Sequence, residues 1–495
     1  MDIISIRLRV PTRSRRSTPQ AVTMASQALS KVLSELGLTS LYHSSRDTKL
    51  LCLQRFTRMF AYGASTLILV VYLSALHVSE TKIGLFMTLT LIGDTLISFV
   101  LTLFADALGR KSILAVGSLL MTGSGVVFAS CGNYWALLAA AVLGVISPSG
   151  NEIGPFRAIE ESTLAQLTPV AKRSDIYAWY SLIGVSGQAL GLIICGWVVN
   201  YLRFSLDWED IAAYRAVFWG YGVLGLTKFV LSVVLSHAVE AEKQTAPIED
   251  PETAPLLGEG AEDVIPKKSF LRSKLPDISK ESRLVVLDLC LLMGLDSFAS
   301  GLVTPSWVTY FFHEKFNLEE GKLGSLFFTA NVITACSMLA SSSLAKRLGN
   351  IKTMVFTHLP SSIFLALIPV PNTLLPAMIF FLLRYSTSSM DTVPRTAFIA
   401  SIVHSNERTA VMGFLNVTKT FAQSLAPVIT GVLVANHLFW VVFVAAGTLK
   451  ATYDLGLLAT FVGHKTHEDK AEEERREEEE RGEEEERRRA AEDGN

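Results

Sequence analysis

The chain has 495 residues, of which 50% are hydrophobic and 18% are charged, and its formal net charge is −2 at pH 7. A soluble domain usually carries about a quarter charged residues, so this composition argues against a soluble protein and for an integral membrane protein. The five cysteines lie far apart, which predicts neither a metal site nor a disulfide framework. We expect no cofactor and no nucleic-acid partner.

Residues 1–56 form a basic segment before the first long apolar run. The Arg- and Ser-rich composition also fits a mitochondrial targeting segment, but a basic cytoplasmic segment is the interpretation that we favour. Leu29, Val32, Leu33 and Leu36 would lie on one helical face, which suits a short helix lying on the inner leaflet.

About twelve apolar runs follow, each long enough for the roughly 20 residues that a membrane-spanning helix needs. They centre on residues 57–77, 82–105, 112–131, 134–153, 175–200, 213–236, 284–312, 321–345, 352–370, 373–394, 408–435 and 437–462. The sequence therefore predicts an all-α integral membrane protein with two six-helix bundles, 57–236 and 284–462. A Pro- and acid-rich cytoplasmic linker, 237–283, separates them, and a charged cytoplasmic tail, 463–495, follows.

Lys and Arg gather in alternate loops between the predicted spans. Basic residues occupy the amino-terminal segment, the loops two–three, four–five and eight–nine, and the linker, whereas the loops at 131–133 and 371–373 are short and uncharged. Because cytoplasmic loops carry the excess of Lys and Arg, we expect both termini in the cytoplasm. The plasma membrane is the predicted location, with the vacuolar membrane as the alternative.

The two halves read as copies of each other. The tripeptides KIG at 82–84 and KLG at 322–324 precede Gly109 and Gly349 by the same distance, 109 − 84 = 349 − 324 = 25 residues. Glu152-Ile-Gly-Pro155 is echoed by Asp391-Thr-Val-Pro394 at nearly the same offset. Matches in one order at one offset indicate duplication, and repeated halves are typical of secondary transporters.

The segment TLFADALGRK at 102–111 resembles the loop two–three signature of the major facilitator superfamily, GxLaDrxGRk. Asp106, Gly109, Arg110 and Lys111 match, whereas Thr102 stands where the signature begins with Gly. The resemblance covers 57–462 and implies two six-helix bundles around a central cavity that opens alternately to each side. It also implies that the four matching residues latch the halves in the outward-facing state; a plain positive-inside turn is the alternative.

Several charged residues fall inside predicted spans, where ionisable groups are costly and indicate function. Asp94 lies near the middle of span two, where it would load and release a proton or act as a hydrogen-bonded packing acid. Asp296 lies in span seven and Arg384 in span ten, two spans that the resemblance places around the cavity. These two residues would then bind substrate, pass a proton or form a structural ion pair. Lys419 in span eleven is similarly deep.

Further polar residues extend this set. Asn416 lies one turn before Lys419 and joins the substrate and proton-coupling candidates. The ends of spans four and ten each carry a proline with acids and bases beside it, which predicts either an inner gate of salt bridges or ordinary helix ends. The inner-gate candidates are Glu152, Arg157, Asp391 and Arg395.

Three charges near the sixth and twelfth spans are predicted to be structural. Lys450 and Asp454 are four residues apart, so they can pair along one helix. Lys228 is predicted to extend its ammonium group to the membrane surface.

The sequence carries no GxxxxGK[ST], HExxH or GxSxG motif, so neither an ATP-driven pump nor an enzyme is predicted. We expect a monomeric, proton-coupled carrier of a small organic solute, working as an exporter. A facilitative uniporter or importer, a nutrient sensor without turnover, and a polytopic membrane enzyme are the alternatives.

Overall fold

The structure is a computed structural model, and it describes residues 37–144, 146–148, 155–240, 280–403, 407–461 and residue 481. Its helices fall into two groups along the chain. The first half comprises α2 (Leu38–Tyr42), α3 (Arg46–Ala75), α4 (Glu80–Leu108), α5 (Arg110–Ser130), α6 (Tyr134–Gly144), α7 (Pro155–Leu167), α8 (Arg173–Phe204) and α9 (Asp210–Val234). The second half comprises α10 (Lys280–Leu302), α11 (Pro305–Phe316), α12 (Glu320–Leu348), α13 (Asn350–Leu367), α14 (Leu374–Thr387), α15 (Thr392–Ile402), α16 (Arg408–Ala435) and α17 (Phe439–Phe461).

Nine helical segments of the described chain are long and apolar enough to cross a membrane, with α10 and α11 counted together. The remaining spans are α6 with α7, α13, and α14 with α15. The predicted fold class, two six-helix halves, is thereby confirmed. The first span begins at Arg46 rather than at 57, since α3 extends into the basic segment. The exact limits of linker and tail stay predictions.

Three spans, the fourth, seventh and tenth, are each broken into two helices. The seventh breaks where Pro305, which lacks a backbone N–H, begins α11 behind Thr304. The tenth breaks between Thr387 and Thr392, and Pro394 occupies the first turn of α15, where its missing N–H costs no helical hydrogen bond. A helix break inside a membrane is tolerated only where protein or water surrounds it.

The duplicated turn glycines both adopt positive φ angles, 88° at Gly109 and 81° at Gly349. Each ends one span and begins the next, at α4–α5 and α12–α13. Only glycine takes this conformation without strain, so the repeated glycine follows directly from a tight reversal at the membrane surface.

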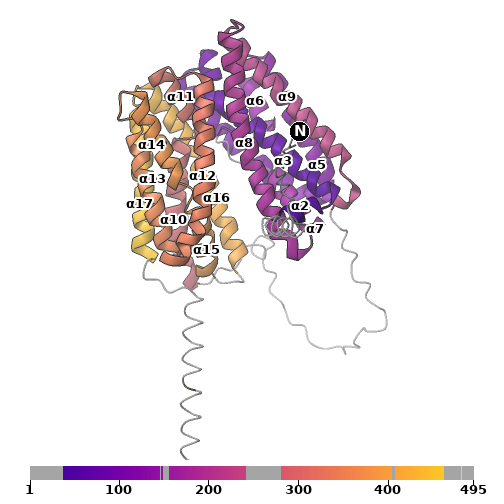
Figure 1. The fold of residues 1–495 in the computed structure, drawn as a ribbon, viewed down its shortest axis with the longest axis vertical. Coiled ribbons are helices and arrows are strands. Elements are labelled where there is room, and N and C mark those ends of the chain that lie inside the picture. Colours follow the sequence, from indigo (N-terminus) through magenta and orange to yellow (C-terminus); the bar gives the residue numbers. More distant parts are fainter. Residues whose placement is uncertain are drawn as a thin grey trace, which may run out of the picture.

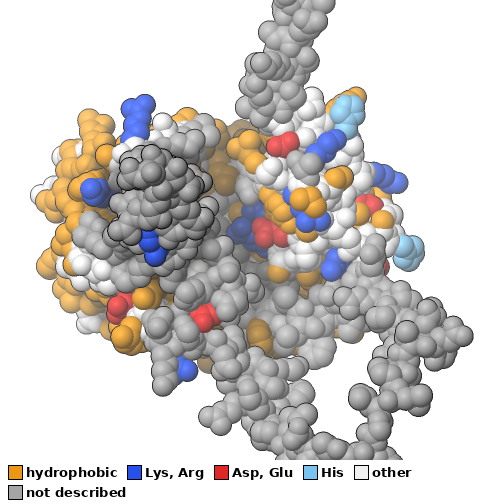
Figure 2. Space-filling model, turned by 90° about the horizontal axis from the view of Figure 1, so that it is seen from below, with side chains coloured by type: hydrophobic (Ala, Val, Ile, Leu, Met, Phe, Trp, Pro, Cys, Tyr) orange, Lys and Arg blue, Asp and Glu red, His pale blue; other side chains and the backbone are white. Residues whose placement is uncertain are grey.

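The two halves lie side by side, lean together at one end and separate at the other (Figure 1). We call the end that holds Arg46, Val234 and Phe461 the terminal end, and the opposite end, with Ala75 and Ala435, the distal end. Seen from the terminal end, a hollow with charged side chains on its walls lies between two lobes (Figure 2).

The hydrophobic core explains this shape. One continuous cluster of buried residues includes Leu67 and Tyr72 of the first half and Trp307, Phe311 and Leu323 of the second. A separate cluster lies wholly within the second half, as its members Val286, Leu289, Val411, Leu457 and Phe461 illustrate. Burial of apolar surface therefore joins the halves at one end and leaves each with its own core at the other.

Candidate functional site

At the distal end, glycines bring helices of opposite halves into backbone contact. A Cβ atom on Gly84 of α4 would lie 2.5 Å from the carbonyl oxygen of Pro427 and 2.9 Å from the Cα of Gly431, both in α16. On the other side of the molecule, a Cβ on Gly324 of α12 would lie 2.5 Å from the carbonyl oxygen of Leu192 in α8. Small residues thus allow the two halves to meet closely on two flanks.

A buried carboxylate reinforces this distal contact. Glu320, the first residue of α12, is fully buried and accepts hydrogen bonds at 2.6 Å from both Arg203 of α8 and Tyr214 of α9. Arg203 also pairs with Asp210 at 2.7 Å. This ion pair between the halves was not predicted from the sequence. The sequence does place the carboxylate of Glu320 directly before a predicted span.

The densest ionic cluster of the described chain lies inside the second half, and Asp296 of α10 is at its centre. Lys450 of α17 donates to one carboxylate oxygen of Asp296 at 2.6 Å, and Arg395 of α15 approaches the other at 3.5 Å. The Nε2 atom of His358 in α13 lies 3.9 Å from the same carboxylate. Four helices therefore converge on one acid that is only 5% exposed. We call these residues, with Asp391 and Asp454, the C-half cluster.

The two other acids of the C-half cluster are also occupied. Asp391 pairs with Arg395 one turn further along the broken tenth span. Asp454 lies 2.8 Å from Nδ1 of His358 and accepts a hydrogen bond from Ser362 at 3.2 Å. Every acid of the cluster therefore has at least one basic neighbour, as buried charges require.

Two predicted pairings are wrong. Lys450 and Asp454 do not pair along α17, because Lys450 reaches Asp296 and Asp454 reaches His358. Asp296 is not paired with Arg384 but with Lys450 and Arg395. The four-residue spacing allows a contact along α17. The packing of α10 and α13 against α17 instead brings Asp296 to Lys450 and His358 to Asp454.

Arg384, Lys419 and Asn416 do not join the ion pairs that the structure describes in the C-half cluster. Arg384 is partly buried beside the ring of Tyr385, 5.3 Å away, and its Nε atom is buried without a hydrogen bond. Lys419 is partly buried, and both cations feel the charge of Asp296. Asn416 is exposed on α16.

The first half buries a smaller cluster, which we call the N-half cluster. Arg58 of α3 donates two hydrogen bonds to Glu160 of α7, at 2.5 and 2.9 Å, and Tyr180 of α8 donates a third at 2.5 Å. Lys228 of α9 lies 4.0 Å from Glu160 and 3.4 Å from the ring centre of Phe156. The prediction that Lys228 reaches the membrane surface is wrong, since its side chain is fully buried.

Asp94 stands apart from both clusters. It is 5% exposed in α4, and the hydrogen bond that the structure gives it comes from Ser98 in the same helix, at 3.4 Å. No ion pair of Asp94 is found within the described residues.

Among the remaining predicted residues, Arg157, Arg110 and Lys111 lie in helix segments toward the terminal end. Arg157 pairs with Glu161 on the exposed side of α7 at 2.7 Å, whereas Glu152 lies outside the described residues. The side chain of Asp106 is likewise outside the described part. The backbone N–H groups of Arg110 and Lys111 donate to Glu240 at 2.7 and 3.3 Å. A different acid, from beyond α9, thus caps the helix that follows Gly109.

His358, Glu160 and Arg58 are the members of the clusters that sequence reasoning missed. A single histidine inside an apolar run, as at 352–370, was a usable signal, because a polar group in a span needs a partner. The predicted first span begins at residue 57 and the predicted fourth span ends at residue 153, so Arg58 and Glu160 fell at or beyond the predicted span ends and were not singled out.

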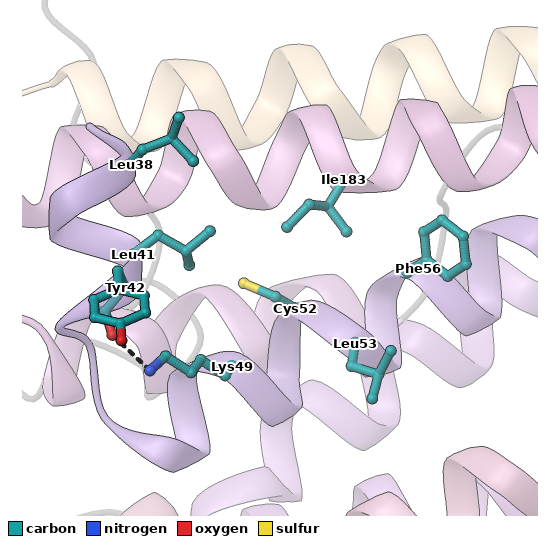
Figure 3. A pocket seen from close by; sticks show the side chains of 8 residues that line it. All are labelled: Leu38, Leu41, Tyr42, Lys49, Cys52, Leu53, Phe56 and Ile183. Atoms are coloured by element: carbon teal, nitrogen blue, oxygen red, sulfur yellow. Dashed lines mark hydrogen bonds between the residues drawn. The ribbon is translucent and has the colours of Figure 1, made fainter. Parts of the chain in front are cut away.

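A separate apolar cavity of about 580 Å³ lies at the terminal end, between α2, α3 and α8 (Figure 3). Leu38, Leu41, Cys52, Phe56 and Ile183 are among the side chains that line it. Lys49, at its edge, donates to the carbonyl oxygen of Tyr42 at 2.6 Å. The cavity contains no carboxylate and none of the residues of the two ionic clusters.

Together, these features define a polytopic membrane protein with two six-helix halves that meet at one end and enclose buried ion pairs beside broken spans. The chain belongs to the major facilitator superfamily, since the sequence profile described as "Major Facilitator Superfamily" matches residues 51–386 and 289–491. It is accordingly a transporter by family and fold.

Comparisons with known proteins agree. The chain is 37% identical over 433 residues to the "Uncharacterized membrane protein YJR124C" of Saccharomyces cerevisiae, which covers 85% of this chain and 95% of that protein. It is 27% identical over 170 residues to the "Quinolone resistance protein NorA" of Staphylococcus aureus, covering 34% and 40% of the two chains. The xylose transporter XylE from E. coli, in an inward open conformation, has the same fold with a TM-score of 0.60 at 15% identity, covering 85% of this chain and 98% of that one.

Proposed function

We propose that the protein is a proton-coupled secondary transporter that exports a small organic solute by alternating access. The observation that carries the proposal is the asymmetry between the two ends. The halves share a core, two glycine contacts and the Arg203–Glu320 ion pair at the distal end, and a hollow separates them at the terminal end. In the orientation predicted from Lys and Arg, the hollow faces the cytoplasm, where an exporter takes up its substrate.

Alternating access then requires the distal contact to open while the terminal end closes. Rigid rocking of two halves about a central site is the established way in which repeated bundles expose one site to either side. The broken fourth and tenth spans carry Arg157, Asp391 and Arg395, which in this proposal form the inner gate with Glu152. The turn Asp106–Lys111 is proposed to latch the halves when the terminal end closes.

Proton coupling is proposed for two acids. Among the described residues Asp94 forms no ion pair, and a bare carboxylate buried in this way is costly, so Asp94 is a candidate to carry the coupled proton. Asp296 is shared by Lys450 and Arg395, and a proton on Asp296 would release Lys450 while Arg395 keeps its pair with Asp391. Either change alters the charge balance beside the proposed substrate path.

Transport against an imposed pH gradient tests the proposal. We would reconstitute the purified full chain into liposomes containing a pH-sensitive dye and add a panel of organic solutes. Solute movement coupled to a change of internal pH is expected in the wild type and is expected to be lost in Asp94→Asn and Asp296→Asn. Asp288→Asn, in α10 but outside both clusters, is the matched control.

The alternatives give different results in the same experiment. Solute movement that ignores the pH gradient would indicate a facilitative uniporter, and tight ligand binding without turnover would indicate a sensor. If Asp296→Asn loses proton-coupled transport and Asp94→Asn retains it, Asp94 does not carry the coupled proton. Protease protection of tags at the two termini in sealed membrane vesicles of known sidedness would test the predicted cytoplasmic orientation, and separation of the cell's membranes would distinguish the plasma membrane from the vacuolar membrane.

A further inference from the structure

The C-half cluster leaves two cations without an acid. Asp296, Asp391 and Asp454 are each within ion-pair distance of a base, and those bases are Lys450, Arg395 and His358. No carboxylate of the described residues lies within ion-pair distance of Arg384 or Lys419. Asp296 nevertheless acts electrostatically on both cations, and Asp391 also acts on Lys419.

Among the described residues of the first half, no acid is paired with either of these cations. Glu160 is fully buried and already shared by Arg58, Tyr180 and Lys228. The other buried acids that the structure describes in the spans of this half are Asp94, whose hydrogen bond stays within α4, and Asp47, which accepts hydrogen bonds from Ser236. If Asp94 carries a proton, as proposed above, it supplies no negative charge either.

A cation held between helices without a counter-charge is unfavourable, and proteins keep such groups where a ligand provides the missing charge. The guanidinium group of Arg384 offers the planar, two-pronged geometry that carboxylates and phosphates accept, and its Nε atom is buried with no hydrogen-bond partner. Lys419 adds a second, mobile donor from α16. The occupied acids of the cluster at the same time leave no free carboxylate to attract a cationic solute.

We propose that Arg384 and Lys419 are the recognition groups for an organic anion, so that the transported solute carries a carboxylate, sulfonate or phosphate. The inference rests on the proposed transport function. It specifies the substrate class and the two residues that contact the charge, while Asp296 and its partners hold the surrounding helices and keep the site positive.

Binding to the purified chain in detergent tests this without any pH gradient. The probes are benzoate, succinate and phenyl phosphate, each beside its uncharged counterpart benzamide, succinamide or phenol, with benzylamine as the cation. We expect at least one anion to raise the thermal midpoint of the wild type more than its uncharged counterpart does. Arg384→Gln and Lys419→Gln are each expected to weaken that binding by roughly tenfold or more, because a charge-assisted hydrogen bond is lost.

Two controls make the result specific. Lys322→Gln removes a cation from the surface at the distal end, where Lys322 pairs with Glu319 at 3.2 Å, and is expected to leave anion binding unchanged. The conservative variants Arg384→Lys and Lys419→Arg are expected to bind more tightly than the glutamine variants.

A measurement without ligand excludes a purely structural role. If the two cations wait for a substrate charge, the ligand-free double variant Arg384→Gln/Lys419→Gln should be at least as stable to heat as the wild type, whereas Arg395→Gln should melt lower. The proposal is overturned if no anion outperforms its neutral counterpart, if benzylamine binds best, or if the ligand-free double variant melts as low as Arg395→Gln. Anion binding that persists without pH-driven transport would contradict the proton coupling and leave the substrate class standing.

Discussion

The N-half and C-half clusters occupy corresponding places in the two repeats, yet they differ in charge balance and in access. Each joins the first span, the second segment of the broken fourth span and the sixth span of its half: α3, α7 and α9 in one, α10, α15 and α17 in the other. The N-half cluster holds one carboxylate, and the side chains of Arg58, Glu160 and Lys228 are fully buried.

The C-half cluster holds three carboxylates, a histidine and neighbouring cations, and the side chain of Arg395 is 16% exposed. A single fully dry acid among cations is suited to fixing helices, because none of its partners can leave without stranding a buried charge. A shared acid with several partners can exchange them at lower cost. The difference teaches that the two halves hold ionic clusters on corresponding helices, while the clusters differ in the number of their acids and in the exposure of their bases.

The largest effect is expected from breaking the N-half cluster. Glu160→Gln leaves Arg58 and Lys228 buried without a counter-charge and should lower the free energy of unfolding by about 3–5 kcal/mol. Thermal unfolding of the purified protein measures the loss. The neighbouring change Glu161→Gln removes a partly exposed pair with Arg157 and should cost less than about 1 kcal/mol. Equal losses in the two variants would refute the fixing role of the N-half cluster.

The second-largest effect is expected from breaking the C-half cluster. Asp296→Asn is expected to lower the free energy of unfolding by only about 1–3 kcal/mol, because Arg395 keeps Asp391 and Lys450 keeps the hydroxyl group of Ser300 as a partner. Transport driven by a pH gradient should nevertheless be abolished, while exchange of solute across the liposome membrane without a gradient is retained. An Asp296→Asn protein less stable than Glu160→Gln would reverse the comparison between the two clusters.

A smaller shift is expected at the distal contact between the halves. Glu320→Gln weakens the bonds from Arg203 and Tyr214 and should shift the balance toward a distal-open state by about 1–2 kcal/mol, or roughly five- to thirtyfold in population. Spin labels at Leu206→Cys and Leu438→Cys, both exposed at the distal end, would report longer distances. Glu319→Gln, a change in a surface pair with Lys322, is the control, and an unchanged distance distribution in Glu320→Gln would count against a gating role.

The smallest effect is expected at the turn after α4. Glu240 accepts hydrogen bonds from the backbone N–H groups of Arg110 and Lys111 at the start of α5. Glu240→Gln should lower the free energy of unfolding by about 0.3–1 kcal/mol, the usual contribution of an acid at a helix amino terminus. The difference between variant and wild type should become smaller at high salt, because salt screens the charge. A loss that does not depend on salt would show that Glu240 acts through packing rather than charge.

The sequence alone determined the class of the protein, its twelve spans and its duplication. These follow from the length of apolar runs, the alternation of Lys and Arg, and matched glycines such as Gly109 and Gly349, because a membrane restricts each segment independently. It also predicted which buried charges matter, since an ionisable residue in a span stands out in the sequence.

Only the tertiary structure decided which charges meet. Lys450 pairs with Asp296, far away in the sequence, rather than with Asp454 four residues on, and Glu160 collects Arg58 and Lys228 from two other helices. Partner choice depends on how helices rotate and approach one another, and local spacing carries no information about that rotation. The physical reason is that a buried charge takes the partner that lowers its desolvation cost most, and helix packing determines which partners it can reach.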